Sequence, residues 1–154
     1  EDAKGPFAIC LRAPEWSPKV TVDINGETLP QTEAKDGWVT LNRAWKAGDT
    51  IHYTMDLAPR VLPGDHLNAG HAAVAYGPLI LTLDAGLNPS PIEAFTLTTP
   101  LNLHLTTGEI ERPLFTTPAR LNKDGKSDSV DLTLTPFYAC GQDGSAFTVW
   151  IKTP

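Results

Sequence analysis

Gly37 to Leu57, GWVTLNRAWKAGDTIHYTMDL, is the stretch that decides the fold. In its second half, apolar and polar residues alternate, and this period-two pattern is typical of an antiparallel strand with one buried face. The apolar members are Ile51, Tyr53, Met55 and Leu57. Val39 and Leu41 show the same alternation earlier, and the turn-forming residues 46–49 separate the two halves. The stretch predicts two strands joined by a hairpin or by a corner between two sheets.

Short alternating segments recur along the whole chain. They are residues 7–12, 20–24, 101–105, 130–135 and 147–151. Residues 71–83 are instead almost continuously apolar from Leu79 to Leu83, which predicts a central core strand covered on both faces. Fourteen prolines and twelve glycines in 154 residues argue against long helices. About ten short strands, with no amphipathic helix, predict an all-β fold, an antiparallel β-sandwich of jelly-roll type. The length fits one domain over residues 1–154.

The connections carry their own turn signals. Asn25-Gly26 predicts a tight hairpin because both residues accept positive φ. Gly77-Pro78 predicts a bend or bulge within the most apolar stretch. Residues 60–68 are predicted to cross irregularly, and residues 84–100 to form a long surface connection with one weak helical turn. Leu114-Phe115 predicts a short strand between two prolines.

Charge and hydropathy limit the kinds of partner that the sequence predicts. The formal net charge is −6 and the twelve basic residues are scattered singly, so we expect neither nucleic acid nor a membrane as partner. No stretch approaches the roughly 18 apolar residues of a membrane span, and no signal segment opens the chain. The chain begins at Glu1 without a methionine, which suggests a piece of a larger protein. Localisation cannot be predicted from this sequence.

No residue pattern points to catalysis. A glycosidase needs two carboxylates roughly 5–10 Å apart, and turn hydrogen bonding explains the candidates Asp23, Asp49 and Asp65. The four histidines lack the spacing of metal ligands. Residues 122–128 resemble a calcium loop only faintly, because the glycine stands at the fourth position and no bidentate glutamate follows. The sequence predicts no catalytic residue and no metal site.

Two cysteines, Cys10 and Cys140, stand far apart in the chain. They could pair only if the first strand and a late strand lie side by side, and free thiols are the commoner outcome. The sequence leaves the pairing open.

Four tryptophans stand at 16, 38, 45 and 150. Trp38 and Trp150 are out of phase with the apolar faces of their strands, so each is predicted to point away from the core. Such a side chain could stack on a sugar or pack under another domain, and we favour the domain contact.

A series of short motifs runs from Phe7 to Ile151. The motifs are Phe7-x-Ile9-x-Leu11-Arg12-x-Pro14-x-Trp16, Val22-x-Ile24-Asn25-Gly26, Gly37-Trp38, Leu41-x-Arg43-x-Trp45-x-x-Gly48-Asp49, Ala73-x-x-x-Gly77-Pro78-Leu79, Pro136-Phe137-Tyr138-Ala139 and Val149-Trp150-Ile151. In order and spacing this series resembles the carboxy-terminal β-sandwich region of glycoside hydrolase family 127 (GH127), the β-L-arabinofuranosidase-like proteins.

The resemblance implies a parent hydrolase whose upstream (α/α) six-hairpin barrel carries a zinc-bound cysteine nucleophile. Zinc would belong to that barrel, and this chain would hold no cofactor. Cys140 departs from the pattern, since the family tends to have Trp there. The motif residues would have structural roles, with Arg43 and Asp49 able to pair. They are Arg12, Trp16, Asn25, Gly26, Arg43, Trp45, Gly48, Asp49, Gly77 and Pro78.

Three functions remain open. The first is a non-catalytic accessory domain that braces the catalytic barrel of such a glycoside hydrolase, with that barrel as its partner. The second is a carbohydrate-binding module that holds a glycan on exposed Trp or Tyr side chains. The third is a stand-alone interaction domain.

Overall fold

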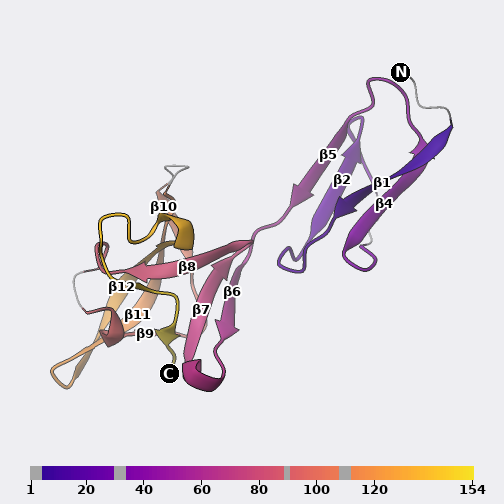
Figure 1. Cartoon of the computed structure of the whole chain (residues 1–154). Coiled ribbons are helices and arrows are strands. Elements are labelled where there is room, and N and C mark those ends of the chain that lie inside the picture. Colours follow the sequence, from indigo (N-terminus) through magenta and orange to yellow (C-terminus); the bar gives the residue numbers. More distant parts are fainter. Residues whose placement is uncertain (1–4, 30–33, 89–90, 108–111) are drawn as a thin grey trace. The chain divides into compact units, whose positions relative to one another are not determined.

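A computed structural model describes residues 5–29, 34–88, 91–107 and 112–154 (Figure 1). The chain divides into two compact units, an amino-terminal unit of residues 1–58 and a carboxy-terminal unit of residues 59–154. The prediction of one domain over residues 1–154 stays a prediction. Fourteen strands and three short 3-10 helices lie in the described residues, where the sequence predicted about ten strands.

The amino-terminal unit consists of two small antiparallel sheets. Its strands are β1 (Pro6–Arg12), β2 (Val20–Ile24), β3 (Glu27–Thr28), β4 (Trp38–Ala44) and β5 (Ile51–Met55). One sheet pairs β1 with β4, and the other has the order β3-β2-β5. The turn at residues 46–49 is therefore a corner between two sheets, one of the two alternatives that the sequence left open.

Alternation along these strands builds a core of its own for the amino-terminal unit. Val22, Ile24, Val39 and Leu41 are buried, while their neighbours in sequence are more exposed. Trp45 and Tyr53 pack against this cluster. Asn25 and Gly26 have φ of 54° and 84°, as the central residues of a type I′ turn require, so the predicted hairpin is confirmed.

The carboxy-terminal unit contains a closed barrel. Its elements are β6 (Pro59–Pro63), η1 (His66–Asn68), β7 (His71–Tyr76), β8 (Leu79–Asp84), η2 (Ile92–Ala94), β9 (Phe95–Leu97), β10 (His104–Thr107), β11 (Leu114–Lys123), β12 (Lys126–Pro136), η3 (Phe137–Ala139), β13 (Phe147–Thr148) and β14 (Ile151–Lys152). Six of the strands pair in the order β8-β12-β11-β9-β14-β7, and β7 pairs with β8 to close the ring. Three further strands pair with strands of this ring: β6 pairs with β7, β10 with β11, and β13 with β8.

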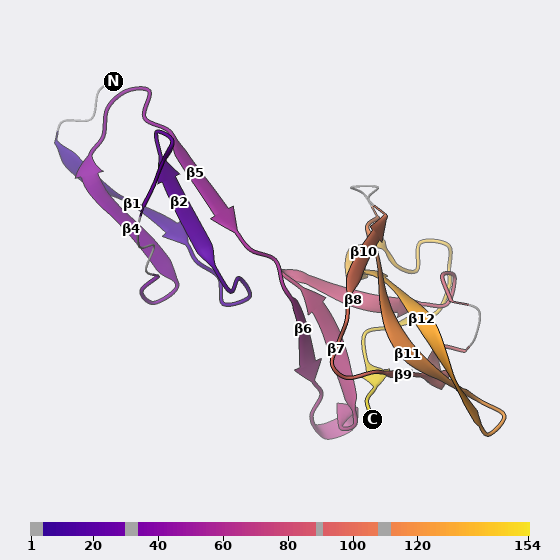
Figure 2. The same cartoon turned by 180° about the vertical axis from the view of Figure 1, so that it is seen from behind.

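One pairing makes this barrel mixed. β14 is parallel to β9, through the pair Lys152 and Thr96, while the other pairings are antiparallel. β11 and β12 run side by side as a long hairpin, drawn in orange in Figure 2. The interior is filled by apolar side chains, among them Val74, Leu81, Leu83, Phe115, Leu132, Leu134 and Ile151.

The all-β class is confirmed, but the predicted antiparallel jelly-roll β-sandwich is wrong. Alternation and turn signals look the same in a sandwich and in a barrel, because each needs strands with one buried face. What separates the two is which distant strands pair, and here β14 joins β7 to β9 and closes the ring.

Three local predictions also need correction. Gly77 and Pro78 form the turn of a hairpin between β7 and β8, with φ of 54° at Gly77, rather than a bend within one strand. Residues 60–68, predicted to be irregular, include most of β6. The short strand predicted at Leu114-Phe115 is the start of the ten-residue β11.

Candidate functional site

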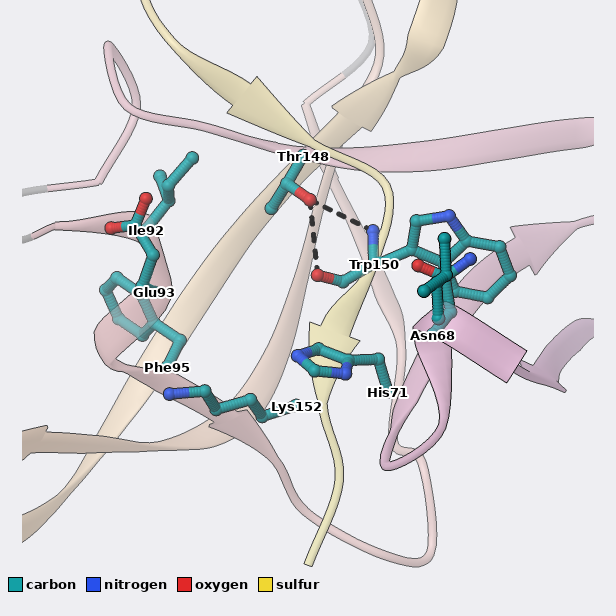
Figure 3. A pocket seen from close by; sticks show the side chains of 9 residues that line it. Asn68, His71, Ile92, Glu93, Phe95, Thr148, Trp150 and Lys152 are labelled. Carbon is teal, nitrogen blue, oxygen red and sulfur yellow. Dashed lines mark hydrogen bonds between the residues drawn. The ribbon is translucent and has the colours of Figure 1, made fainter. Parts of the chain in front are cut away.

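A pocket on the outside of the barrel contains Trp150, and Figure 3 shows its side chains. We call it the Trp150 pocket. Its volume is about 330 Å³, and it is lined by Leu67, Asn68, His71, Ile92, Glu93, Phe95, Thr148, Trp150 and Lys152. Three segments distant in sequence therefore contribute to one depression: η1 with the start of β7, η2 with β9, and the residues from Thr148 to Lys152.

Strand geometry explains why these side chains meet. Ile151 points into the barrel and is 2% exposed, so its neighbours Trp150 and Lys152 point outward. Lys152 pairs in register with His71 on β7 and with Thr96 on β9. Residues in register share a face of the sheet, so His71 and Lys152 lie next to each other on the outer surface.

Hydrogen bonds fix the backbone at Trp150 (Figure 3). The Thr148 hydroxyl accepts from the Trp150 N–H at 3.1 Å and donates to the Trp150 carbonyl at 3.2 Å. His71 Nδ1 lies 3.3 Å from the Ala69 carbonyl oxygen and, as the protonated nitrogen, donates to it. That tautomer leaves Nε2 as the acceptor nitrogen of the ring.

The charged groups of the pocket do not neutralise each other directly. Glu93 on η2 and Lys152 on β14 both line it. Within the described ranges, the one salt bridge is between Arg112 and Asp84, outside the pocket. The pocket therefore offers a carboxylate, an ammonium group and an imidazole beside an aromatic face.

Trp38, the other tryptophan predicted to point outward, belongs to the amino-terminal unit. It is 46% exposed on β4, and the Arg12 guanidinium lies 5.6 Å from its ring centroid. Arg12 also donates to the Gly37 carbonyl at 2.7 Å. Around Trp38 lies a wide, shallow depression lined by Cys10, Lys35, Asp36 and Thr40. Trp38 and Trp150 are thus on separate units.

Asn25 and Asp49 link two turns of the amino-terminal unit. The Asn25 amide donates to Asp49 Oδ1 at 2.9 Å and accepts from the Thr50 N–H at 2.8 Å. Asp49 Oδ2 accepts from the Lys46 N–H at 2.9 Å, and this bond, followed by the one from Asn25, lowers the pKa of Asp49. Gly48 has φ of 89° in the same turn.

Arg43 does not pair with Asp49 in the described part of the chain. Its guanidinium lies 5.2 Å from the centroid of the Trp45 ring. The Trp45 indole N–H donates to the Phe7 carbonyl at 3.0 Å, which ties β1 to the end of β4. Trp16 is half-buried in the turn after β1.

Asp84 is a buried carboxylate that sequence reasoning missed. It is 0% exposed and accepts from Ser145 Oγ at 2.6 Å, the Gly86 N–H at 2.8 Å and the Gly141 N–H at 3.3 Å. Desolvation raises its pKa, but these hydrogen bonds outweigh it, and the net pKa is lowered. The sequence feature that could have identified Asp84 is an Asp-x-Gly pattern at the end of an apolar strand, where an Asx turn is typical.

The described residues contain no group of three or more His, Cys, Asp or Glu side chains that could hold a metal ion. Cys10 and Cys140 are free thiols and lie in different units. These residues do not fit a zinc site. Among the described residues, no helix is long and apolar enough to span a membrane.

Comparison with family models gives a match in the first part of the chain. Residues 1–57 match the family model of the GH127 middle domain, described as β-L-arabinofuranosidase. The match therefore lies in the amino-terminal unit. The carboxy-terminal placement predicted within GH127 proteins stays a prediction, because the matching model is that of the middle domain.

Solved structures of glycoside hydrolases and arabinofuranosidases are similar to this chain. A GH127 β-L-arabinofuranosidase from Geobacillus stearothermophilus T6 superposes on 97% of this chain with a TM-score of 0.86 and 21% identity. A glycoside hydrolase superposes on 97% with a TM-score of 0.83 and 27% identity. A GH127 β-arabinofuranosidase superposes on 94% with a TM-score of 0.79 and 26% identity. The chain spans 27%, 28% and 25% of their lengths. No curated protein matches.

Proposed function

We propose that the chain is a non-catalytic accessory part of a GH127 β-L-arabinofuranosidase-like glycoside hydrolase and that it braces the catalytic domain. One observation carries this proposal. The family match covers residues 1–57 and the amino-terminal unit ends at residue 58, so the matched middle domain corresponds to one whole structural unit.

The lengths support the same function. A GH127 β-L-arabinofuranosidase and a second glycoside hydrolase superpose on 97% of this chain, which covers only 27–28% of theirs. In a parent of similar size, most of the chain lies outside these two units. The catalytic residues, and the zinc that the family resemblance implies, belong in that remainder, with the catalytic domain as the partner of this chain.

An exposed aromatic surface fits a bracing contact. Phe137, Tyr138 and Phe147 are 54%, 56% and 43% exposed, and the rings of Phe137 and Phe147 meet edge to face at 5.9 Å. We call these three residues the Phe137 surface. A cluster of exposed apolar side chains is typical of an interaction site, since leaving it in water is unfavourable. In this proposal the catalytic domain covers it.

The test compares the 154-residue chain with the full-length parent. We expect the chain to leave 4-nitrophenyl β-L-arabinofuranoside unhydrolysed and the parent to cleave it. Replacing both Phe137 and Tyr138 with Ser should lower the melting temperature of the parent by several degrees and leave that of the isolated chain nearly unchanged. Leu67→Ser is the matched control, because Leu67 is 99% exposed away from this surface.

Two results would contradict the bracing function. Hydrolysis by the isolated chain would place catalysis within it. Equal melting shifts in the chain and the parent would show that the Phe137 surface stabilises only its own unit.

A carbohydrate-binding module is the second candidate, and the Trp150 pocket is the observation that favours it. An exposed indole beside polar side chains combines an apolar stacking face with hydrogen-bonding groups. A stand-alone interaction domain is excluded if the reading frame encodes several hundred further residues.

A further inference from the structure

We propose that the Trp150 pocket binds a neutral sugar, a monosaccharide or disaccharide stacked on the indole of Trp150. This inference rests on the carbohydrate-binding candidate and names its site and ligand class. It does not depend on the bracing function, because an accessory domain can hold a sugar on one surface and contact a partner through another.

The first support is an exposed aromatic side chain on a fixed backbone. Trp150 is 36% exposed, and its backbone N–H and carbonyl are both bonded to the Thr148 hydroxyl. The next residue, Ile151, is anchored in the barrel interior. A backbone that is already ordered loses little conformational freedom on binding, so more of the stacking energy remains as affinity.

The second support is the mixture of donors and acceptors among the residues that line the same pocket as Trp150. Lys152 supplies a donor, Glu93 supplies an acceptor, and His71 presents Nε2 when Nδ1–H donates to the Ala69 carbonyl. Each sugar hydroxyl both donates and accepts, so it can use groups of either kind. Figure 3 shows Lys152 and His71 extending toward the same side of the pocket from neighbouring strands.

Charge and size narrow the ligand class. Because Glu93 and Lys152 both line the pocket, their opposite charges offset each other there, and this favours an uncharged ligand. The volume of about 330 Å³ is at the lower end of the roughly 300–1,000 Å³ of small-molecule pockets. One or two sugar rings match this size better than a long chain does.

The test is an NMR titration of the full 154-residue chain with L-arabinose, xylobiose and D-glucuronate. We expect saturable shifts of the Trp150 indole N–H and of the amides of His71 and Lys152, with a millimolar Kd for the neutral sugars. D-glucuronate should bind more weakly than the neutral sugars. Trp150→Phe assigns the Trp150 indole signal among the four tryptophans.

Variants locate the site. Trp150→Ala should weaken binding about tenfold or more through loss of the stacking face. Glu93→Gln should weaken sugar binding severalfold. Because Glu93 is exposed, this substitution should leave the fold intact, so the loss of affinity would not come from unfolding. Trp38→Ala is the matched control, since Trp38 is similarly exposed on the other unit, and it should leave the affinity unchanged.

The possible outcomes distinguish a failure of the Trp150 site from a failure of the carbohydrate-binding function. Binding lost in Trp38→Ala but kept in Trp150→Ala would overturn this site and leave the carbohydrate-binding candidate standing. Absence of saturable shifts with every sugar would overturn both, while the hydrolysis and melting measurements would still decide the bracing function. Tighter binding of D-glucuronate than of L-arabinose would overturn the neutral-sugar assignment.

Discussion

The side-chain amide of Asn25 donates to Asp49 Oδ1 at 2.9 Å and so joins the β2–β3 turn to the corner between β4 and β5. The same Asn25 side chain accepts from the Thr50 N–H, and its backbone N–H donates to the Thr50 carbonyl. Two turns 24 residues apart in sequence therefore form one hydrogen-bonded unit.

Two substitutions at Asn25 should distinguish the stability that comes from its side-chain hydrogen bonds from the stability that comes from its tolerance of a positive φ. Asn25→Gly keeps the positive φ but removes the side-chain bonds, and it should lower the stability of the amino-terminal unit. Asn25→Ala should cost about 1–2 kcal/mol more, because alanine is disfavoured at φ of 54°. Urea unfolding of both variants measures the difference. Equal losses would show that the conformation of Asn25 contributes nothing.

Gly37→Ala should disturb the contact between Arg12 and Trp38. A Cβ built at Gly37 would overlap the Arg12 guanidinium, so this side chain must leave the Gly37 carbonyl and the Trp38 ring. Gly48→Ala is the matched control, since Gly48 has a similar positive φ and open space around it. We expect Gly37→Ala to cost about 1 kcal/mol more than Gly48→Ala.

A double-mutant cycle checks whether the extra cost of Gly37→Ala comes from the displaced Arg12 side chain. In an Arg12→Ala background the two glycine substitutions should cost nearly the same, because the contact is already lost. A difference that persists there would assign the extra cost to something other than Arg12.

Trp45→Ala should destabilise the amino-terminal unit by about 2–3 kcal/mol. This is below the roughly 3–5 kcal/mol for a fully buried tryptophan, because Trp45 is only half-buried. Trp45→Phe retains most of the ring but removes the N–H that bonds the Phe7 carbonyl, and it should cost about 1 kcal/mol. Denaturant unfolding measures both variants. An unchanged midpoint for Trp45→Ala would contradict the packing of Trp45 on the core.

Asp84 should make the carboxy-terminal unit sensitive to acid. Its pKa in the folded state is below the usual 3.8, so ionised Asp84 stabilises the fold above that pH. This contribution is lost as the pH falls through the folded-state pKa. Asp84→Asn should therefore lower stability at pH 7 by about 1–3 kcal/mol and reduce the loss of stability below pH 4.

Melting curves between pH 7 and pH 2 measure this dependence. Asp131→Asn is the control, since Asp131 is exposed on β12. If Asp84→Asn and the unmodified chain lose stability in parallel on acidification, the acid sensitivity comes from other carboxylates.

Thr117→Val should stabilise the barrel by about 1 kcal/mol. Thr117 is 0% exposed, and its hydroxyl has no hydrogen-bond partner in the part of the chain that is described. Valine keeps the shape and removes the unsatisfied group. Thr82→Val should destabilise instead, because the equally buried Thr82 hydroxyl donates to the Thr135 carbonyl at 2.8 Å. Thermal unfolding should shift in opposite directions for the two variants.

Local structure was largely predictable where the signal was local. The Asn25-Gly26 turn and the apolar faces of β2, β4 and β12 follow from turn chemistry and period-two alternation. The apolar face predicted over residues 51–57 holds only in part, because Met55 and Leu57 are 39% and 49% exposed. β11 was mostly missed because Pro118 stands within it. Pro118 faces the gap between β9 and β10, where Thr98 Oγ1 donates to its carbonyl and no ladder N–H is needed.

The closure of the barrel and the composition of the Trp150 pocket could not be predicted from the sequence, for a different reason. Both depend on segments that meet only in three dimensions, such as η2 at residue 93 and β14 at residue 152. The phase of Trp150 predicted an outward side chain, and the structure places it 36% exposed. Nothing in the sequence placed His71 or Glu93 beside it.

The two-residue strand β14 has a consequence for the order of events during synthesis. β9 reaches the ribosome exit more than fifty residues before Lys152, which supplies its parallel partner. Until then, one edge of β9 and the first residues of β7 carry unpaired backbone groups. The ring therefore cannot close until residue 152 has been synthesised, and before that point these unpaired edges are open to pairing with other chains.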